Sequence, residues 1–361
     1  MDNKIYMIYG RDPSSMTRSL LEAEDAASLI GDRSSRIVIK PNFVIAGDPD
    51  DGATTHTGIT IAVIEYLQDN GFENITVAEG SWVGSRTEDA FRLLDYYSLA
   101  EKYNISLVDT KKDRFRKVES HGITMEICET ALSADFIINL PVLKGHCQTL
   151  MTHAMKNLKG FLSDRSKRDF HRYGLMRPIA AINDVVKPGL TISDSLCGDL
   201  DFEEGGNPVQ MDRMMASTDP ILLDAYSASL MGFSVDDIGY LKVAKEWGIG
   251  DTDASHAEII ELNKPVVAPS KPKGQAQRLS RYTDADDACS ACFASLIHAL
   301  KRLDEEGSLH LLDKKVSIGQ GYRGRNPEIG VGSCCSGAAH TVKGCPPKAD
   351  DILDMLHDYI S

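Results

Sequence analysis

Strand-like and helix-like segments alternate along the first two-thirds of this 361-residue sequence. The strand-like segments are short apolar runs, which is typical of strands buried on both faces of a sheet. They cover residues 5–9, 35–41, 74–79, 106–108, 135–140, 190–194 and 258–261. Helical periodicity lies between them, at residues 14–29, 58–70, 87–94, 150–158, 180–186 and 220–231. This alternation predicts an α/β fold built on a layered, mostly parallel sheet.

Residues 261–281 interrupt the alternation with three prolines, a basic bias and no strong periodicity. Such a stretch is typical of a linker or an extended crossover. We therefore predict an α/β domain at 1–262, a linker or crossover at 263–282 and a small α/β module at 283–361. In the module, the pattern predicts helices at 287–303 and 348–360 and strands at 315–319 and 328–332.

The composition excludes several classes of protein. Hydrophobic residues make up 42% and charged residues 25% of the chain, which is ordinary for a globular protein. The net charge of −14 argues against nucleic acid as a partner, because such binding depends on Lys and Arg. No apolar run reaches the roughly 20 residues that span a bilayer, and the N-terminus has no signal-peptide pattern. We predict a cytoplasmic protein with no membrane partner.

Five of the eight cysteines fall in the last 73 residues. Cys289 and Cys292 form a C-x2-C pair at the start of a predicted helix, and Cys334 and Cys345 follow in loops. In a reducing compartment, clustered thiols more often bind a metal than form disulfides. The helix N-terminus and nearby glycines favour an anionic iron–sulfur cluster, so we predict a [4Fe–4S] cluster on these four residues. Structural zinc and no metal are the alternatives, and Cys335 is an alternative ligand.

The remaining cysteines, Cys128, Cys147 and Cys197, stand alone in the sequence, and we expect them to be small buried hydrophobic residues.

The stretch IGVGSCCSGAAHTVKGCPPKADDILDML resembles the cluster-binding element of subunits in NADH:quinone oxidoreductase and nickel–iron hydrogenases. The resemblance covers about 30 residues, and it favours Cys334 over Cys335 as the ligand.

Polar residues follow several of the predicted strands, where ligands bind in open α/β sheets. The lysines can form a cationic pocket for an anionic substrate, and two histidines can act as general acid and base. For these catalytic roles we predict Lys144, His146 and His171, with His171 in a polar loop. For substrate binding and orientation we predict Lys40, Asn42, His56, Lys156, Asn157, Asp194, Asp219 and Asp224.

Simpler interpretations remain for some of these residues. Thr54 or Thr55 can cap a helix, and so can Asp219 before Pro220. A single loop histidine is more often a hydrogen-bonding surface residue than a catalyst. No phosphate-binding glycine loop follows a predicted strand, so nucleotide binding has no support.

Taken together, these segments resemble the family catalogued as domain of unknown function 362, often found in iron–sulfur proteins. The matching pieces span about 35–245 and are IVIKPNFV, TTHTG, ADFIINLPVLKGH, MKNLKG, the loop with His171, VKPGLTISDSLCGDL and ASTDPILLDAYSASLMGF. The family commonly has a glycine after the aspartate of the strand end, where this chain has Ser195 after Asp194. The resemblance implies an α/β domain with one polar site, commonly coupled to an iron–sulfur module.

The leading functional hypothesis is an iron–sulfur oxidoreductase that passes electrons between the cluster and a small anionic molecule. A redox partner such as ferredoxin would exchange electrons with the cluster. An iron–sulfur lyase or dehydratase is one alternative, although it normally leaves one iron without a protein ligand. A non-enzymatic electron carrier is the other.

Overall fold

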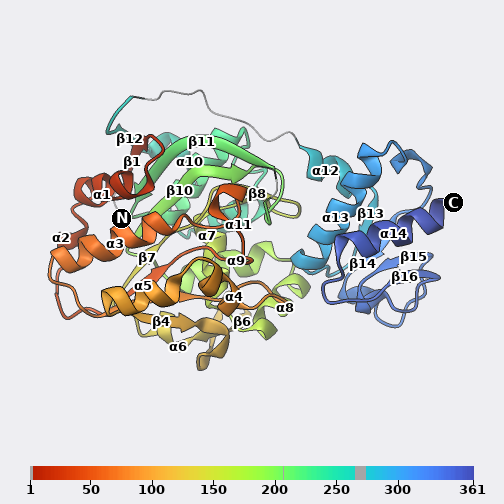
Figure 1. Cartoon of the computed structure of the whole chain (residues 1–361), viewed down its shortest axis with the longest axis horizontal. Helices are drawn as coiled ribbons and strands as arrows, with labels where there is room; N and C mark the ends of the chain where they lie inside the picture. The colour runs from red at the N-terminus through yellow and green to blue at the C-terminus, as the bar shows by residue number, and fades with distance from the viewer. Residues whose placement is uncertain (1–2, 206, 265–273) are drawn as a thin grey trace.

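The computed structural model describes residues 3–205, 207–264 and 274–361. Its large body contains an eight-stranded sheet, and a small body at the C-terminal end contains a four-stranded sheet (Figure 1). The large sheet has the order β12 (Glu258–Glu261), β1 (Lys4–Tyr9), β11 (Pro208–Ser217), β10 (Leu190–Asp199), β7 (Phe136–Asn139), β2 (Ile37–Lys40), β3 (Ile75–Glu79) and β4 (Ser106–Asp109). All neighbouring pairs are parallel except those that β11 makes with β1 and β10. The predicted α/β class with a mostly parallel sheet is confirmed.

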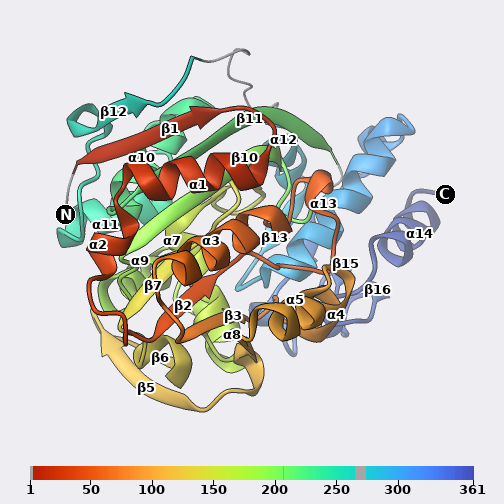
Figure 2. The same cartoon turned by 60° about the vertical axis from the view of Figure 1, so that its left-hand side comes forward.

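Helices cover both faces of the sheet. Strand β2 illustrates why, because Ile37 and Ile39 pack into one apolar cluster and Val38 packs into the other. Helices of the first cluster are α1 (Pro13–Ala23), α2 (Ala26–Ile30), α3 (Thr57–Asp69), α4 (Thr87–Leu93) and α5 (Tyr96–Tyr103). Helices of the second are α6 (Glu129–Leu132), α7 (Ala154–Asn157), α8 (Asp164–Arg172), α9 (Met176–Val185), α10 (Pro220–Met231) and α11 (Gly239–Trp247). Figure 2 shows α1 and α3 in front of the sheet.

Of the helix caps proposed from the sequence, Asp219 is confirmed and Thr55 is not. Asp219 accepts hydrogen bonds from the backbone N–H groups of Ile221 and Leu222, so its interpretation as the cap of α10 is right. Thr55 is not a helix cap, because its hydroxyl donates to the carbonyl of Leu140, 2.8 Å away.

The predicted helix at 150–158 is wrong in its first part. Residues Leu150–Thr152 form strand β9, which pairs with β8 (Lys144–His146) in a short antiparallel ribbon. The helix begins only at Ala154, because the carboxylate of Asp224 accepts the N–H groups of Ala154 and Met155. A second hairpin, β5 (Phe115–Ser120) with β6 (Ile123–Cys128), was also not predicted.

The predicted helix at 14–29 divides into α1 and α2. Asp25 lies between them in the left-handed backbone conformation, with φ of 47°. Because a helix requires negative φ, the chain cannot continue as one helix through this residue.

The C-terminal body has four parallel strands where the sequence predicted two. They are β13 (Thr283–Ala285), β14 (Val316–Ile318), β15 (Ile329–Val331) and β16 (His340–Val342), packed against α13 (Ser290–Glu305) and α14 (Ala349–Ile360). Part of the predicted linker, Gln275–Ser280, is helix α12, while 265–273 lie outside the described residues. The domain boundaries at 262 and 283 stay predictions.

None of the helices in the described ranges is both long enough and apolar enough to cross a membrane.

Candidate functional site

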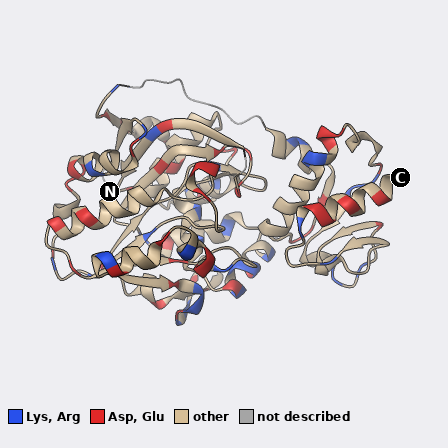
Figure 3. Ribbon diagram, viewed as in Figure 1, with Lys and Arg blue, Asp and Glu red and all other residues tan. Residues whose placement is uncertain are grey.

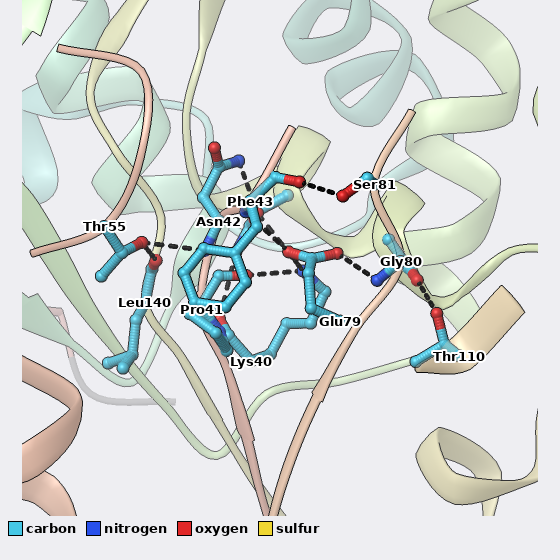
Figure 4. Close-up of polar contacts among 12 residues, drawn as sticks. Lys40, Pro41, Asn42, Phe43, Thr55, Glu79, Gly80, Ser81, Thr110 and Leu140 are labelled. Atoms are coloured by element: carbon cyan, nitrogen blue, oxygen red, sulfur yellow. Dashed lines mark hydrogen bonds and ion pairs between the residues drawn. The ribbon is translucent and has the colours of Figure 1, made fainter. Parts of the chain in front are cut away.

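The carboxyl ends of β2 and β3 bring a buried lysine and a buried glutamate together (Figure 4). The Lys40 Nζ atom lies 2.5 Å from Glu79 Oε2 and donates to the carbonyl of Pro41 at 2.7 Å. The Glu79 carboxylate also accepts the N–H groups of Phe43 and Gly80. Every charge of the pair therefore has a partner inside the protein, and Lys40 is fully buried. Glu79 was not predicted.

A network of amide side chains continues from this ion pair. Asn42 donates to Asn157 Oδ1 at 2.8 Å, and Asn157 donates to Asn139 Oδ1 at 2.8 Å. The Lys144 ammonium donates to Asn42 Oδ1 at 3.0 Å and to the carbonyl of Ala53 at 2.5 Å. Burial lowers the pKa of Lys144 to about 8. Lys40 and Lys144 thus form part of a closed network. They are not among the lining residues of the neighbouring cavity, whereas Asn42 and Asn157 are.

A cavity of about 80 Å³ lies between this network and the C-terminal body. Four of the residues predicted for catalysis or substrate binding line it: Asn42, Lys156, Asn157 and His171. It is also lined by five charged residues that were not predicted: Glu79, Lys159, Lys167, Arg168 and Glu203. The backbone at Gly160 forms part of its wall, where an added Cβ would collide with the Lys40–Glu79 pair. The wall is therefore packed directly against the closed network.

The lysines of the cavity differ in their partners. Lys156 makes an ion pair with Glu203, and both side chains are buried. Lys167 donates to the carbonyls of Gly80 and Ser81 at 2.8 and 2.9 Å. No hydrogen bond or ion pair holds the Lys159 ammonium within the described part of the chain. Burial, reinforced by other cations, lowers the pKa of Lys159 to about 7 and that of Lys167 to about 8.

The two histidines predicted as acid and base occupy different positions. His146 Nδ1 accepts the N–H groups of Gln148 and Thr149, which places the proton on Nε2, 2.9 Å from Glu203 Oε2. Burial lowers the pKa of His146 to about 4, so the ring is neutral. It is fully buried and is not part of the cavity wall.

His171 lies in the last turn of α8, so its prediction as a loop residue is wrong. The amphipathic pattern of this nine-residue helix, with Phe170 and His171 on its buried side, was hidden by its many charged residues. Nε2 of His171 lies 3.5 Å from the backbone N of Ser290, and its buried Nδ1 atom has no partner among the described residues. Burial lowers the pKa of His171 well below 6.5, so the ring is neutral. It presents an unused nitrogen at the cavity.

His56 and Asp194 form a separate pair outside the cavity wall. The Nδ1 and backbone N atoms of His56 both lie 2.8 Å from Asp194 Oδ2. Burial alone would lower the pKa of His56, but Asp194 and Asp50 outweigh it and raise the pKa to about 9. Asp219 and Asp224 also lie away from the cavity wall and cap α10 and α7.

A Ser–His–Asp arrangement not predicted from the sequence lies behind α7. His153 Nε2 is 2.5 Å from Ser193 Oγ, and His153 Nδ1 is 2.8 Å from Asp224 Oδ1. All three side chains are fully buried, and Ser193 also contacts the hydroxyl of Ser195. Because no substrate can reach the serine, this arrangement is a structural tie between β10, α7 and α10.

The clustered cysteines lie on the other side of the cavity. Cys289 immediately precedes α13, Cys292 is in its first turn, and Cys345 follows β16; all three line the cavity. Burial and then the neighbouring Cys345 and Cys334 raise the pKa of Cys289 to about 11. Cys335 is buried and donates to the carbonyl of Ser317, away from this group. Cys128, Cys147 and Cys197 are buried, as predicted.

The chemical type of the donors, four thiols, is one that binds iron–sulfur clusters. Four thiols from three segments act on one another, and burial together with their mutual repulsion opposes ionisation unless a cationic metal core offsets both. Gly332 leaves its backbone close to the sulfur of Cys292, since an added Cβ would lie 3.8 Å from it. No group of three or more His, Cys, Asp or Glu side chains in the described ranges is arranged to hold a metal ion. A four-iron cluster binds each thiolate at a different corner, so its ligands are spaced more widely than those of one ion.

Comparison with known proteins identifies the family of the large body. Residues 37–229, more than half of the chain, match the family described as "Domain of unknown function (DUF362)". The thylakoid-associated protein sll1697 of Synechocystis sp. is 25% identical over 268 residues, which cover 70% of this chain and 78% of that protein. The lactate racemase apoprotein from Thermoanaerobacterium thermosaccharolyticum matches with a TM-score of 0.35 and 14% identity, over 54% of this chain and 52% of that one.

Proposed function

We propose that this chain, which belongs to the DUF362 family, is a redox enzyme with two adjoining parts. Cys289, Cys292, Cys334 and Cys345 would hold a [4Fe–4S] cluster, and the cavity beside them would bind a small anionic molecule. One observation carries the proposal: cysteines of the C-terminal body and basic side chains of the large body line the same cavity.

The charge of the cavity supports an anionic ligand. Its wall contains four cationic side chains (Lys156, Lys159, Lys167 and Arg168) and two carboxylates (Glu79 and Glu203). Each carboxylate is already paired with a lysine, Glu79 with Lys40 and Glu203 with Lys156. Lys159, Lys167 and Arg168 therefore favour a positive potential in the cavity, although the chain as a whole has a net charge of −14. Figure 3 shows that Lys and Arg (blue) and Asp and Glu (red) are distributed over both bodies.

The chain's own groups would bind and orient the ligand. The cluster, when bound, supplies single electrons. Lys156 is fixed by Glu203, so its ammonium is held in place before a ligand arrives. The neutral His171 accepts the N–H of Ser290 at Nε2, so its proton lies on Nδ1, and this free N–H can donate a hydrogen bond or pass the proton to a ligand.

An external electron carrier such as ferredoxin is the proposed partner. Cys345 is exposed, so one side of the proposed cluster would be accessible from the surface. All eight cysteines are free, which suits the reducing conditions of the cytoplasm. A carrier without enzymatic activity is a weaker proposal, because electron transfer alone does not require a cavity with an unpaired lysine and an unpaired histidine.

Metal analysis of the full chain, purified without oxygen, tests the proposal. We expect about four irons per chain and a brown colour with absorbance near ~400 nm. Cys292→Ser should lose the iron, whereas Cys335→Ser is the matched control and should keep it. One zinc per chain with no colour, or equal loss of iron from both variants, would contradict the proposal.

A further inference from the structure

The three lysines of the cavity are not equivalent, and the difference identifies one of them. The Lys156 ammonium is held by a carboxylate, and the Lys167 ammonium is held by two carbonyls. Within the described residues, the ammonium of Lys159 has neither kind of partner. Lys159 is only partly buried and lines the cavity, so its amine can be reached by a ligand there.

The surroundings of Lys159 also favour its neutral, nucleophilic form. It lies in the 3-10 turn Leu158–Phe161, three residues after Lys156, so two amines from neighbouring turns face one cavity. Burial and the nearby cation disfavour a second positive charge, which agrees with the lowered pKa of about 7. A desolvated lysine beside another cation is a recognised form of activated amine nucleophile.

We propose that Lys159 forms an imine with the carbonyl carbon of a small oxo acid bound in the cavity. The inference rests on the proposed function only in that the acid occupies the same anion-binding cavity. Lys167 and Arg168, which also line the cavity, would hold the carboxylate of the acid. The substrate class is thereby narrowed from small anions to carboxylates that carry an aldehyde or ketone group.

The step is balanced without any oxidant or reductant. The Lys159 nitrogen adds to the carbonyl carbon, and the C=O double bond becomes a C–OH single bond in a carbinolamine. The C–O bond then breaks, a C=N bond forms, and the oxygen leaves as water. Overall, one ammonium and one carbonyl give one iminium and one water, so charge and protons are conserved.

The neutral His171 provides a group that can serve this step. Its Nδ1 atom is buried at the cavity and has no partner among the described residues. It can therefore hydrogen-bond the hydroxyl of the carbinolamine or pass a proton to it without losing an existing contact. A ligand that only formed an ion pair with Lys159 would leave the Nδ1 atom of His171 without a hydrogen-bond partner.

Reductive trapping of the full chain tests the proposal. Protein prepared without oxygen is incubated with pyruvate and sodium cyanoborohydride, digested, and analysed by mass spectrometry. We expect the mass of the reduced imine on the peptide that contains Lys159. L-lactate, which has a hydroxyl in place of the carbonyl, should give no adduct.

Two variants make the result specific. Lys159→Arg keeps the positive charge but cannot form an imine, so its adduct should disappear while calorimetry still detects pyruvate binding. Lys187→Arg removes an exposed lysine and should trap pyruvate at Lys159 as well as the wild type does.

Other outcomes overturn the proposal. Pyruvate binding without an adduct on Lys159 would refute the imine and leave the anion-binding cavity standing. Equal adducts on Lys159 and Lys187 would show unspecific modification. Neither binding nor trapping would refute the oxo acid class, while the iron content of the same preparation reports separately on the proposed cluster.

Discussion

Two groups of polar side chains lie next to each other at the same edge of the sheet, and they differ in how their charges are satisfied. In the closed network, Lys40 is paired with Glu79, and Lys144 donates to Asn42 and a carbonyl. In the cavity, Lys159 and the Nδ1 atom of His171 have no partner in the described parts of the chain. The residue types are alike, and Glu79 and Asn42 of the network also border the cavity, but the charges of the network have protein partners whereas those two cavity groups do not.

The chemical type of a side chain therefore does not by itself identify a functional site. A buried charge with all its partners contributes to the fold, and breaking one partner is costly. A buried polar group without a partner has a cost that a ligand can relieve. The account therefore expects the closed network to control stability and the cavity to control binding.

Breaking the closed network should have the largest effect on stability. Lys40→Met leaves the Glu79 carboxylate buried without its cation, which should lower the free energy of unfolding by about 3–5 kcal/mol. Urea unfolding measures this change. The double variant Lys40→Met/Glu79→Gln also removes the unpaired carboxylate charge, so it should recover much of the lost free energy of unfolding. If Lys40→Met were as stable as the wild type, the closed network would not control stability, and it would not differ from the cavity in this respect.

His56 provides a pH-dependent test of a second sealed pair. Its pKa of about 9 in the folded protein lies above the ordinary value of 6.5. The pairing with Asp194 therefore stabilises the protein fully below about pH 6.5, and the stabilisation is lost as the pH rises through about 9. The shift corresponds to roughly 3 kcal/mol as an upper value.

The variant His56→Gln lacks this contribution. Its stability deficit relative to the wild type, measured by urea unfolding, should be large at pH 6 and small at pH 10. A deficit that does not change over this range would mean that the imidazolium–carboxylate pair is not what stabilises this position.

The smallest effect on stability is expected for the unpaired lysine of the cavity. Lys159→Met removes no partner contact, so the free energy of unfolding should change by no more than about 1 kcal/mol. Pyruvate affinity, measured by calorimetry, should fall about tenfold or more, because a charge-assisted contact is lost. If Lys159→Met were strongly destabilised but bound pyruvate normally, Lys159 would contribute to stability and not to binding, which is the opposite of what we expect for the cavity.

Much of the fold could be predicted because it depends on local pattern. The buried strands β2, β3 and β7 are continuous apolar runs, and α10 begins at the predicted Asp219–Pro220 signal. The strands that were missed include short ones, such as β13 and β16 with three residues each, and the ten-residue β11, whose apolar pattern is interrupted by Asp212 and Arg213. The existence of the short strands depends on parallel neighbours that lie far away in the sequence.

The candidate site could be predicted only in outline. The rule that polar loops follow strand ends located Asn42, and the polar end of a predicted helix located Lys156 and Asn157. It could not tell which lysine would remain unpaired, because Glu203 lies 47 residues from Lys156 and Glu79 lies 39 residues from Lys40. Pairing across such separations is set by the tertiary fold.

The most direct test of the account is electron paramagnetic resonance of the reduced, oxygen-free protein with and without pyruvate. If the cysteines and the basic cavity form one site, the reduced protein gives a [4Fe–4S] signal, and pyruvate changes that signal in the wild type. A protein without such a signal, or a signal that stays the same while calorimetry shows pyruvate bound, would contradict the central claim.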